Sequence, residues 1–208
     1  MSAPRFIAPR RPRPTDFSAV TWATRLHLCA VDEEPEVRRR HIAALLAFTP
    51  TVVRVDTRMR IRFEHGATAL WLSQVLAHKD VALTDVSTDG GAVTISNPQI
   101  VLGRYGFRDG RWVFGRDPDA VVGVSRGAVH AAATFSRRGM QVLCPSAPMM
   151  LTLAALLARL GIKAQPSAGE PRAVVGPGRV VDALDRLGIA DVGAQYHLMR
   201  ESNAGDVL

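Results

Sequence analysis

AALLAFTPTVVRVDTRMRIRFEHGATALWLSQVL, residues 43–76, decides the fold, because its pattern returns in residues 126–157 as RGAVHAAATFSRRGMQVLCPSAPMMLTLAALL. In each copy a helix rich in small residues leads into two strands joined by a short turn and then into an apolar helix. One constant offset of 81 residues places Met59 on Met140, Ile61 on Val142, Leu70 on Leu151, Leu72 on Leu153 and Leu76 on Leu157. The competing interpretation is a chance match within an alanine-rich chain. A lone module of this size cannot bury its apolar face, so we expect two copies to pack together as one pseudo-twofold domain.

Each half is predicted to contain a helix, two strands, a helix, two strands and a final helix. Predicted helices cover residues 18–29, 36–48, 67–76, 121–132, 147–160 and 179–187, with a short helix after Asn97 and Pro98. Predicted strands form hairpins at 53–63 and 134–143, a pair around the turn at 89–91, and a pair at 162–165 and 172–175. The chain then divides into a disordered tail rich in arginine and proline at 1–16, a first unit at 17–120, and a second unit with a C-terminal tail at 121–208.

Apolar and polar residues alternate in the first hairpin, which predicts one apolar face and one arginine face. Near the turn, the alternation does not determine which residues belong to which face. The apolar set is Val53, Val55, Met59, Ile61 and Phe63, and the polar set is Arg54, Asp56, Arg58, Arg60 and Arg62. In the helix at 67–76 we expect Leu70, Ser73 and Leu76 to face inward. We also expect Gly127 and Ala131 to form a small-residue face that nests against the alanines at 43, 44 and 47.

The chain is strongly basic, with 26 basic against 19 acidic residues, a net charge of +7 and a pI near 10.6. This balance favours polyanionic partners without proving one. Lys79 and Lys163 are the only lysines. Arginine pairs bidentately with phosphate, but an arginine-rich composition is also what a GC-rich genome produces.

Several function classes lack a signature. Cys29 and Cys144 have apolar neighbours and no metal-binding spacing, so we expect reduced core thiols, without a zinc site or a disulfide. The histidines have no metal spacing, and we expect His65 and His130 to pack or to face solvent. We find no enzyme motif, cofactor motif, signal peptide or membrane span, which makes the cytoplasm the expected compartment.

Four stretches together resemble a known family: SAVTWATRLHL (18–28), RRRHIAALLAF (38–48), RGAVHAAATF (126–135) and QVLCPSAPMMLTLAALLARLGIKAQ (141–165). The duplicated order of elements resembles LAGLIDADG homing endonucleases. More closely, residues 17–200 resemble the WhiA-type regulators of Gram-positive bacteria, which carry a degenerate LAGLIDADG domain. The resemblance implies an α+β, duplicated αββαββα LAGLIDADG-like pseudo-twofold domain and a role in transcription control of cell division or sporulation.

Two departures from these families affect the expected activity. The endonucleases hold a divalent metal with an acidic residue at the foot of each small-residue helix, because a hard cation needs carboxylate oxygens. The corresponding positions here are Phe48 or Thr49 and Ala132, so we expect no nuclease activity and no bound metal. WhiA-type proteins also carry a C-terminal helix-turn-helix domain, and we expect it to be missing because the sequence stops at Leu208.

Two function hypotheses follow. The first is a non-catalytic DNA-binding transcription regulator of the nucleoid, contacting the phosphates of double-stranded DNA with little sequence selectivity. Its predicted nucleic-acid-binding residues are Arg54, Arg58, Arg60, Arg62, Arg137 and Arg138. The arginine face is equally compatible with a solvated polar surface. The second hypothesis is a module that binds transcription proteins or itself, with Trp22, Trp71 and Trp112 as anchors, although tryptophans are more often core residues. The oligomeric state stays open.

Overall fold

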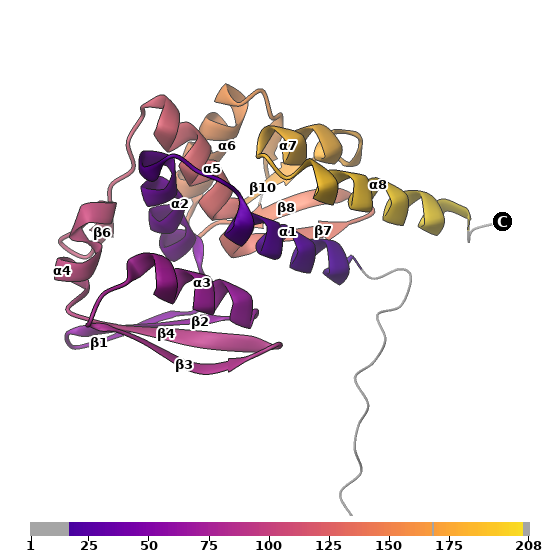
Figure 1. Ribbon diagram of the computed structural model, residues 1–208. Helices are drawn as coiled ribbons and strands as arrows, with labels where there is room; N and C mark the ends of the chain where they lie inside the picture. Colours follow the sequence, from indigo (N-terminus) through magenta and orange to yellow (C-terminus); the bar gives the residue numbers. More distant parts are fainter. Residues whose placement is uncertain (1–16, 168, 206–208) are drawn as a thin grey trace, which may run out of the picture.

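Two four-stranded sheets with the same strand order form the two halves of the chain (Figure 1). The computed structural model describes residues 17–167 and 169–205, so the predicted tail at 1–16 lies outside the described residues. The order is β1-β2-β4-β3 in the first sheet and β7-β8-β10-β9 in the second. All paired strands run antiparallel. The strands are β1 (Val52–Val55), β2 (Arg58–Phe63), β3 (Val81–Ser87), β4 (Gly90–Ser96), β7 (Ala133–Ser136), β8 (Gly139–Leu143), β9 (Ala164–Pro166) and β10 (Arg172–Val175). The repeated order confirms the predicted duplication.

Equivalent helices accompany the two sheets. They are α2 (Pro35–Phe48) and α3 (Gly66–Leu76) in the first half, and α5 (Pro118–Ala132) and α6 (Ala147–Arg159) in the second. Ser146 caps α6, as predicted, by accepting a hydrogen bond from the Met149 amide at 3.4 Å. In Figure 1, α3 lies over one face of the first sheet, and no described element covers the opposite face.

Burial follows the offset of 81 residues. Four of the five aligned pairs are buried in both halves: Met59 with Met140, Ile61 with Val142, Leu72 with Leu153, and Leu76 with Leu157. The fifth pair, Leu70 and Leu151, is exposed in both halves, at 43% and 58%. The prediction that Leu70 faces inward was therefore wrong, whereas Leu76 is buried as predicted and Ser73 is half-buried. A helix on a sheet buries one stripe, and in α3 that stripe runs through Ala69, Leu72 and Leu76, with Leu70 one position beyond it.

The two halves meet along α2 and α5, which lie against each other at close range. A Cβ added at Gly127 would lie 2.2 Å from the His41 carbonyl oxygen and 2.7 Å from the Ala44 Cβ. A Cβ at Gly123 would lie 2.4 Å from the Val37 carbonyl oxygen. The predicted nesting of Gly127 against the first small-residue helix is confirmed, and Gly123, four residues earlier, shares this contact. Only glycine permits backbones to approach this closely.

In the first hairpin, the residues of β1 lie on the opposite faces of the sheet from those predicted. Cross-strand partners share a face of a sheet, and Val53 pairs with Arg60, Val55 with Arg58, and Arg54 with Met59. Val53 and Val55 therefore lie on the arginine face, where they are 59% and 60% exposed. Arg54 lies on the opposite face, at the edge of the sheet. The two-residue turn decides this, because it sets Val55 opposite Arg58.

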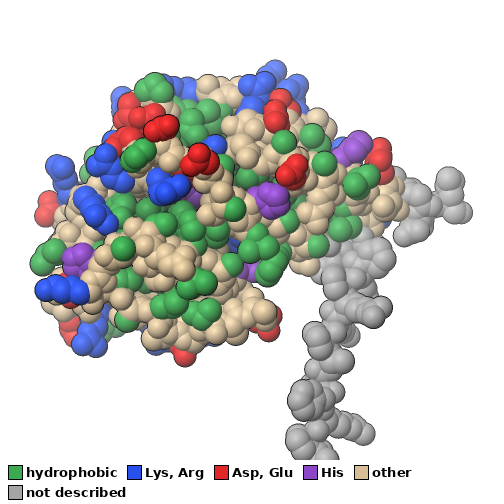
Figure 2. Space-filling view, in the orientation of Figure 1, with side chains coloured by type: hydrophobic (Ala, Val, Ile, Leu, Met, Phe, Trp, Pro, Cys, Tyr) green, Lys and Arg blue, Asp and Glu red, His purple; other side chains and the backbone are tan. Residues whose placement is uncertain are grey.

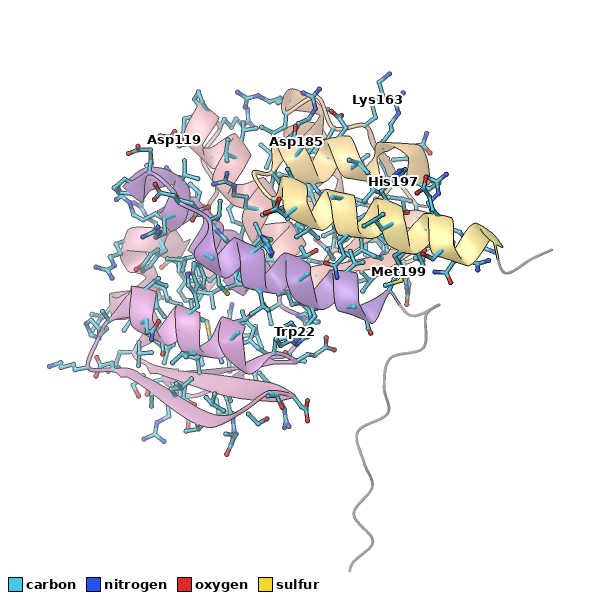
Figure 3. All side chains as sticks on the ribbon, turned by 45° about the vertical axis from the view of Figure 1, so that its right-hand side comes forward. Trp22, Asp119, Lys163, Asp185, His197 and Met199 are labelled. Atoms are coloured by element: carbon cyan, nitrogen blue, oxygen red, sulfur yellow. The ribbon has the colours of Figure 1, made fainter. Side chains whose placement is uncertain are left out.

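The remaining elements connect and cover the halves. They are α1 (Ser18–Ala30), α4 (Pro98–Leu102), η1 (Gly103–Tyr105), β5 (Phe107–Arg108), β6 (Arg111–Trp112), η2 (Pro177–Arg179), α7 (Val180–Arg186) and α8 (Ala190–Gly205). Ala190–Gly205 form the 16-residue helix α8, where the sequence predicted no helix after residue 188. Tyr196 anchors α8, because it is fully buried and its hydroxyl donates to the Ser136 carbonyl oxygen at 3.1 Å. Helix α1 runs beside both α3 and α8 (Figures 1 and 3).

Each half has its own core, and α2 contributes to both. Ile42 and Leu45 join the core under the first sheet, whereas Ala44 and Phe48 join the core of the second half. This division fixes the two halves as one body. In residues 17–205, leaving out 168, no helix combines the length and apolar character needed to cross a membrane.

Candidate nucleic-acid interface

The open face of the first sheet carries a row of arginines on β2. Arg58, Arg60 and Arg62 are exposed and alternate with the buried Met59, Ile61 and Phe63. The period of two in a strand causes this separation, because successive side chains point to opposite faces. We call Arg58, Arg60 and Arg62 the arginine row. Side chains project freely from this face in Figure 3.

Two of the three guanidinium groups in the row have no acidic partner among the residues that the structure describes. Arg60 forms an ion pair with Asp85 at 3.1 Å, in which both side chains are more than half exposed. An exposed pair of this kind contributes little to stability and opens readily. Among the described residues, no carboxylate oxygen lies within 4.0 Å of Arg58 or Arg62. The row therefore presents net positive charge to solvent.

Arg54, also predicted to be part of the interface, does not lie on this face. Its Nη1 donates a hydrogen bond to the Gly110 carbonyl oxygen at 2.9 Å. Its guanidinium carbon lies 5.0 Å from the centre of the Phe107 ring, a cation–π arrangement. Both contacts hold Arg54 toward the β5–β6 hairpin, away from the arginine row.

The predicted residues of the second half lie at the β7–β8 turn. Arg137 and Arg138 are both exposed, and Arg137 donates to the Asn203 carbonyl oxygen of α8. The open face of the second sheet does not repeat the arginine row. It carries Thr134, Gln141 and Val174, and one arginine, Arg172, whose Nη1 donates to Gln141 Oε1 at 2.9 Å. The positive charge is therefore concentrated on the first sheet.

Between the two sheets, at the feet of α2 and α5, the surface is hollowed into a cavity of about 230 Å³. We call it the central hollow. Residues from both halves line it, among them Thr49, Arg62, Ala132, Gln141 and Arg172. Arg25 from α1 also lines it, so three arginines from separate elements line the central hollow. Sequence reasoning identified only Arg62 of these three, because Arg25 and Arg172 lie in segments far from the hairpin and only the fold brings them together.

Arg25 and its neighbours define the charge at one side of the central hollow. Arg25 is buried and forms an ion pair with Glu64 at 3.2 Å. Burial lowers the pKa of Arg25, and the Glu64 carboxylate opposes that shift. Burial, together with the positive charge of Arg25, lowers the pKa of His65 to about 4. His65 is therefore neutral near pH 7, and the hollow keeps an excess of positive charge.

The positions that correspond to endonuclease metal ligands carry no carboxylate. Phe48 and Ala132 are buried, and the Thr49 hydroxyl donates to the Leu45 carbonyl oxygen at 2.6 Å. Within the described part of the chain, no group of three or more His, Cys, Asp or Glu side chains is placed to hold a metal ion. A hard divalent cation needs several oxygen ligands, which these three side chains do not offer.

A buried chain of polar side chains crosses the contact between α2 and α5. His41 Nδ1 donates to the Glu33 carboxylate at 3.0 Å, and His41 Nε2 lies 2.9 Å from His130 Nδ1. His130 Nε2 in turn lies 3.1 Å from the Thr68 hydroxyl. Arg126 donates to Glu33 from the other side at 3.0 Å. We call Glu33, His41, His130, Thr68 and Arg126 the buried polar chain. It joins residues of both halves through hydrogen bonds.

The environment of the buried polar chain fixes the charge of its members. Glu33 is 9% exposed, and although burial raises its pKa, the hydrogen bonds and charges of His41 and Arg126 lower it further than burial raises it. His130 is 1% exposed, and burial, with the positive charges of His41 and Arg25, holds its pKa well below its usual value. Glu33 is therefore ionised and His130 neutral at pH 7.

The structure decides between the two predictions made for His130: it is packed, not exposed. The signal in the sequence was a histidine within a run of small residues, AVHAAATF, on a helix that packs closely. Such a polar side chain needs a partner on the neighbouring helix. Its actual partners, His41 and Thr68, lie 89 and 62 residues away in the sequence and gave no local indication.

The three tryptophans have different environments. Trp71 is half-buried, and its ring lies 5.1 Å from His41 and 5.4 Å from His130. Trp112 is half-buried and lies 4.9 Å from the Phe107 ring. Trp22 on α1 is 41% exposed, as is Leu70 on α3 at 43%. Figure 2 shows hydrophobic side chains gathered across the middle of the face that displays these two helices, and Figure 3 locates Trp22.

No protein-family model matches the sequence, and a search of curated proteins finds no match. Among solved structures, the chain is similar to full-length DUF199/WhiA from Thermotoga maritima, at 12% identity and a TM-score of 0.61 over 88% of this chain and 66% of that chain. It is similar to the N-terminal LAGLIDADG domain of DUF199/WhiA, at 13% identity and a TM-score of 0.56 over 81% and 89%. It is also similar to the homing endonuclease I-DmoI in complex with its nicked target DNA, at 9% identity and a TM-score of 0.56 over 76% and 98%.

These similarities agree with the strand order and the paired helices: the chain has a LAGLIDADG fold of the WhiA-like kind. Identities this low support the shared fold and not a shared activity. The chain spans about two thirds of the length of the full-length WhiA protein that it matches.

Proposed function

We propose that this chain is a non-catalytic, DNA-binding regulator of transcription that resembles WhiA and acts on the nucleoid in the bacterial cytoplasm, in the control of cell division or sporulation. One observation carries the proposal. The arginine row lies on the open sheet face, and Arg62 at one end of the row also lines the central hollow. Arg25 and Arg172 line the same hollow and add two further basic residues. The endonuclease I-DmoI, which has the same fold, was solved with its target DNA, and this supports the proposal.

Contacts of this kind would give affinity with little base selectivity. Guanidinium groups that bind phosphate oxygens position a protein on the duplex without reading its sequence. Non-specific dissociation constants at physiological salt are about 10⁻⁴ to 10⁻⁶ M. Arg58 and Arg62 would contribute most, because each has its charge uncompensated by an acidic partner among the described residues. Arg60 would first have to release Asp85.

The test is a titration of fluorescent duplex DNA with the full chain at several salt concentrations. Four or five phosphate contacts predict a slope of about −4 when the logarithm of the association constant is plotted against the logarithm of salt concentration. Replacing Arg58, Arg60 and Arg62 together by glutamine would make the slope less steep by about one for each phosphate that is no longer neutralised. The matched control replaces Arg39, Arg116 and Lys163 by glutamine. These residues are exposed, and their replacement removes the same charge away from the arginine row.

The result that would contradict the proposal is equal weakening by both triple variants, which would mean that only net charge matters. The non-catalytic part has its own test, because the side chains at Phe48, Thr49 and Ala132 offer no carboxylate for a divalent cation. We expect supercoiled plasmid to remain uncut in the presence of Mg²⁺ or Mn²⁺. Plasmid cleavage that is lost on adding a chelator would overturn the proposal that the chain is non-catalytic.

A second candidate function is the binding of a protein partner. The observation that favours it is the exposure of Trp22 and Leu70 on the neighbouring helices α1 and α3, at 41% and 43%. Large apolar side chains exposed on neighbouring elements are typical of interaction sites when they form one continuous patch. Absence of DNA binding at every salt concentration would favour this alternative over the first.

A further inference from the structure

The central hollow combines an apolar wall with basic groups, a combination that the binding of DNA phosphates does not require. Its lining includes the apolar residues Phe63, Ala131 and Leu143 and the basic residues Arg25, Arg62 and Arg172. A phosphate of a DNA backbone is recognised at an open, polar surface and would leave the apolar wall uncovered. Sites for small molecules are instead lined mostly by apolar side chains with a few polar groups that fix orientation.

The size of the central hollow limits what it accepts. Its volume is about 230 Å³. For comparison, an engineered apolar cavity of about 150 Å³ in another protein binds benzene. The central hollow therefore has room for one six-membered ring with one substituent, and it lacks the room for a dinucleotide or a larger cofactor.

The charge of the central hollow selects an anion. Against three guanidinium groups stands one lining carboxylate, Glu64, and it is already paired with Arg25 at 3.2 Å. Arg172 donates to Gln141 and to the exposed Glu170, and Arg62 has no carboxylate within 4.0 Å among the described residues. A planar guanidinium group binds carboxylate or phosphate oxygens through two parallel hydrogen bonds.

Two polar atoms of lining residues also have no hydrogen-bond partner among the described residues. His65 Nδ1 and Arg172 Nε are buried and accept or donate no hydrogen bond within the described part of the chain. Buried polar groups without a partner are rare, because each loses its hydrogen bonds to water without gaining one in the protein. Binding of an acidic oxygen to Arg172 Nε would require this side chain to shift, because the atom has almost no exposed surface.

We propose that the central hollow binds a small organic anion, consisting of one planar ring that bears one carboxylate or phosphate group. The ring packs against Phe63 and Leu143, and the acid group is held by Arg62 and Arg172. This proposal deepens the proposed function and rests on it in one respect: because Arg62 belongs to both sites, the bound anion and DNA compete. The chain would then respond to a metabolite by releasing DNA.

Binding of the anion is tested on the full chain without DNA, by isothermal titration calorimetry. The probes are phenyl phosphate and benzoate, with benzyl alcohol as the ring without a charge and inorganic phosphate as the charge without a ring. We expect at least one of the two charged rings to bind with one site per chain, at least tenfold more tightly than either control probe. Equal binding of phenyl phosphate and inorganic phosphate, with no binding of benzoate, would overturn the proposal.

Two matched variants locate the site. Arg62→Gln should weaken binding of the charged ring at least tenfold, whereas Arg58→Gln should leave it unchanged, because Arg58 lies on the same strand and face but does not line the central hollow. Both side chains are exposed, so both variants should fold. Equal binding by the wild-type chain and Arg62→Gln would place the ligand elsewhere and refute the assignment.

Competition is measured separately, by adding the bound probe to a preformed complex with duplex DNA. Displacement of DNA supports the shared role of Arg62. Probe binding without displacement refutes the competition. If DNA does not bind at all, the proposed function fails while the calorimetry with the protein alone still decides whether the central hollow binds the anion.

Discussion

Replacing Glu33 by glutamine should destabilise the protein far more than any surface change, because Glu33 balances two cationic or donor groups inside the molecule. The Glu33 side chain is 1% exposed, and its oxygens lie 3.0 Å from His41 Nδ1 and 3.0 Å from Arg126 Nη1. Arg126 is itself only 12% exposed. Both donors bind the same oxygen, Oε1, and glutamine keeps one acceptor oxygen. Glutamine nevertheless removes the negative charge, so the Arg126 guanidinium charge stays uncompensated, and its NH2 group replaces the Oε2 atom that lies 3.1 Å from His41 Nδ1.

The magnitude follows from that geometry. Removing one partner of a buried charge pair costs about 3–5 kcal/mol, because the other charge is left buried and unpaired. A domain has a total unfolding free energy of about 5–15 kcal/mol, so Glu33→Gln would remove a large part of it. With a urea dependence of about 1–3 kcal/mol per M, the midpoint of unfolding should fall by at least about 1 M.

The assay is urea unfolding followed by tryptophan fluorescence, since Trp71 lies against both His41 and His130. The matched control is Glu34→Gln, which changes the adjacent, exposed residue and should alter the unfolding free energy by no more than about 0.5 kcal/mol. A loss below about 1 kcal/mol for Glu33→Gln, or equal losses for the two variants, would refute the view that the buried polar chain holds the halves together.

Three further predictions concern stability and reactivity. Stability should fall on acidification, because His130 is held neutral in the folded state and takes up a proton on unfolding below its usual pKa of about 6.5. His130 contributes a slope of up to about 1.4 kcal/mol per pH unit below pH 6.5, and His65, whose pKa is lowered to about 4, adds to it in the same direction. Urea midpoints that do not change between pH 7.5 and 5 would contradict this. Gly127→Ala should lower the unfolding free energy by about 1–3 kcal/mol, because the added Cβ would lie 2.2 Å from a backbone oxygen of α2. The control Gly103→Ala, whose Cβ would have no atom within 4 Å, should leave thermal stability unchanged or raise it slightly. Burial raises the pKa of Cys29 to about 12 and that of Cys144 to about 11, so neither thiol forms the reactive thiolate readily at pH 8. Mass spectrometry should therefore find little iodoacetamide labelling of the native protein and rapid labelling of the protein in urea. Equally fast labelling of native and unfolded protein would contradict this.

Local patterns in the sequence predicted the elements well. The period of two in residues 58–63 placed Met59, Ile61 and Phe63 inside and the arginine row outside, and the structure agrees. The small residues of α2 and α5 predicted a close helix contact, and Gly127 lies in it. The chain after residue 188 was missed as a helix, although Val192, Tyr196 and Asn203 are buried at helical spacing. Its weak apolar character hid that pattern.

The face of β1 was predicted incorrectly for a different reason. Alternation alone does not say which set of residues faces the core when both sets flank a turn. The pairing of Val55 with Arg58 decides it, and that pairing depends on the length of the turn. Arg54 was consequently assigned to the arginine row, although it contacts Phe107 and Gly110 on the other side.

By itself the sequence determined the duplication, the order of helices and strands, and the alternating charge on β2, because each depends on residues within a few positions of one another. Only the tertiary structure decided that Glu33, His41 and His130 join in one buried chain, and that Arg25, Arg62 and Arg172 converge on one hollow. Those residues lie in separate elements. Hydrogen bonding and burial act over a few ångströms in space, so their effects become visible only when the fold has brought the elements together.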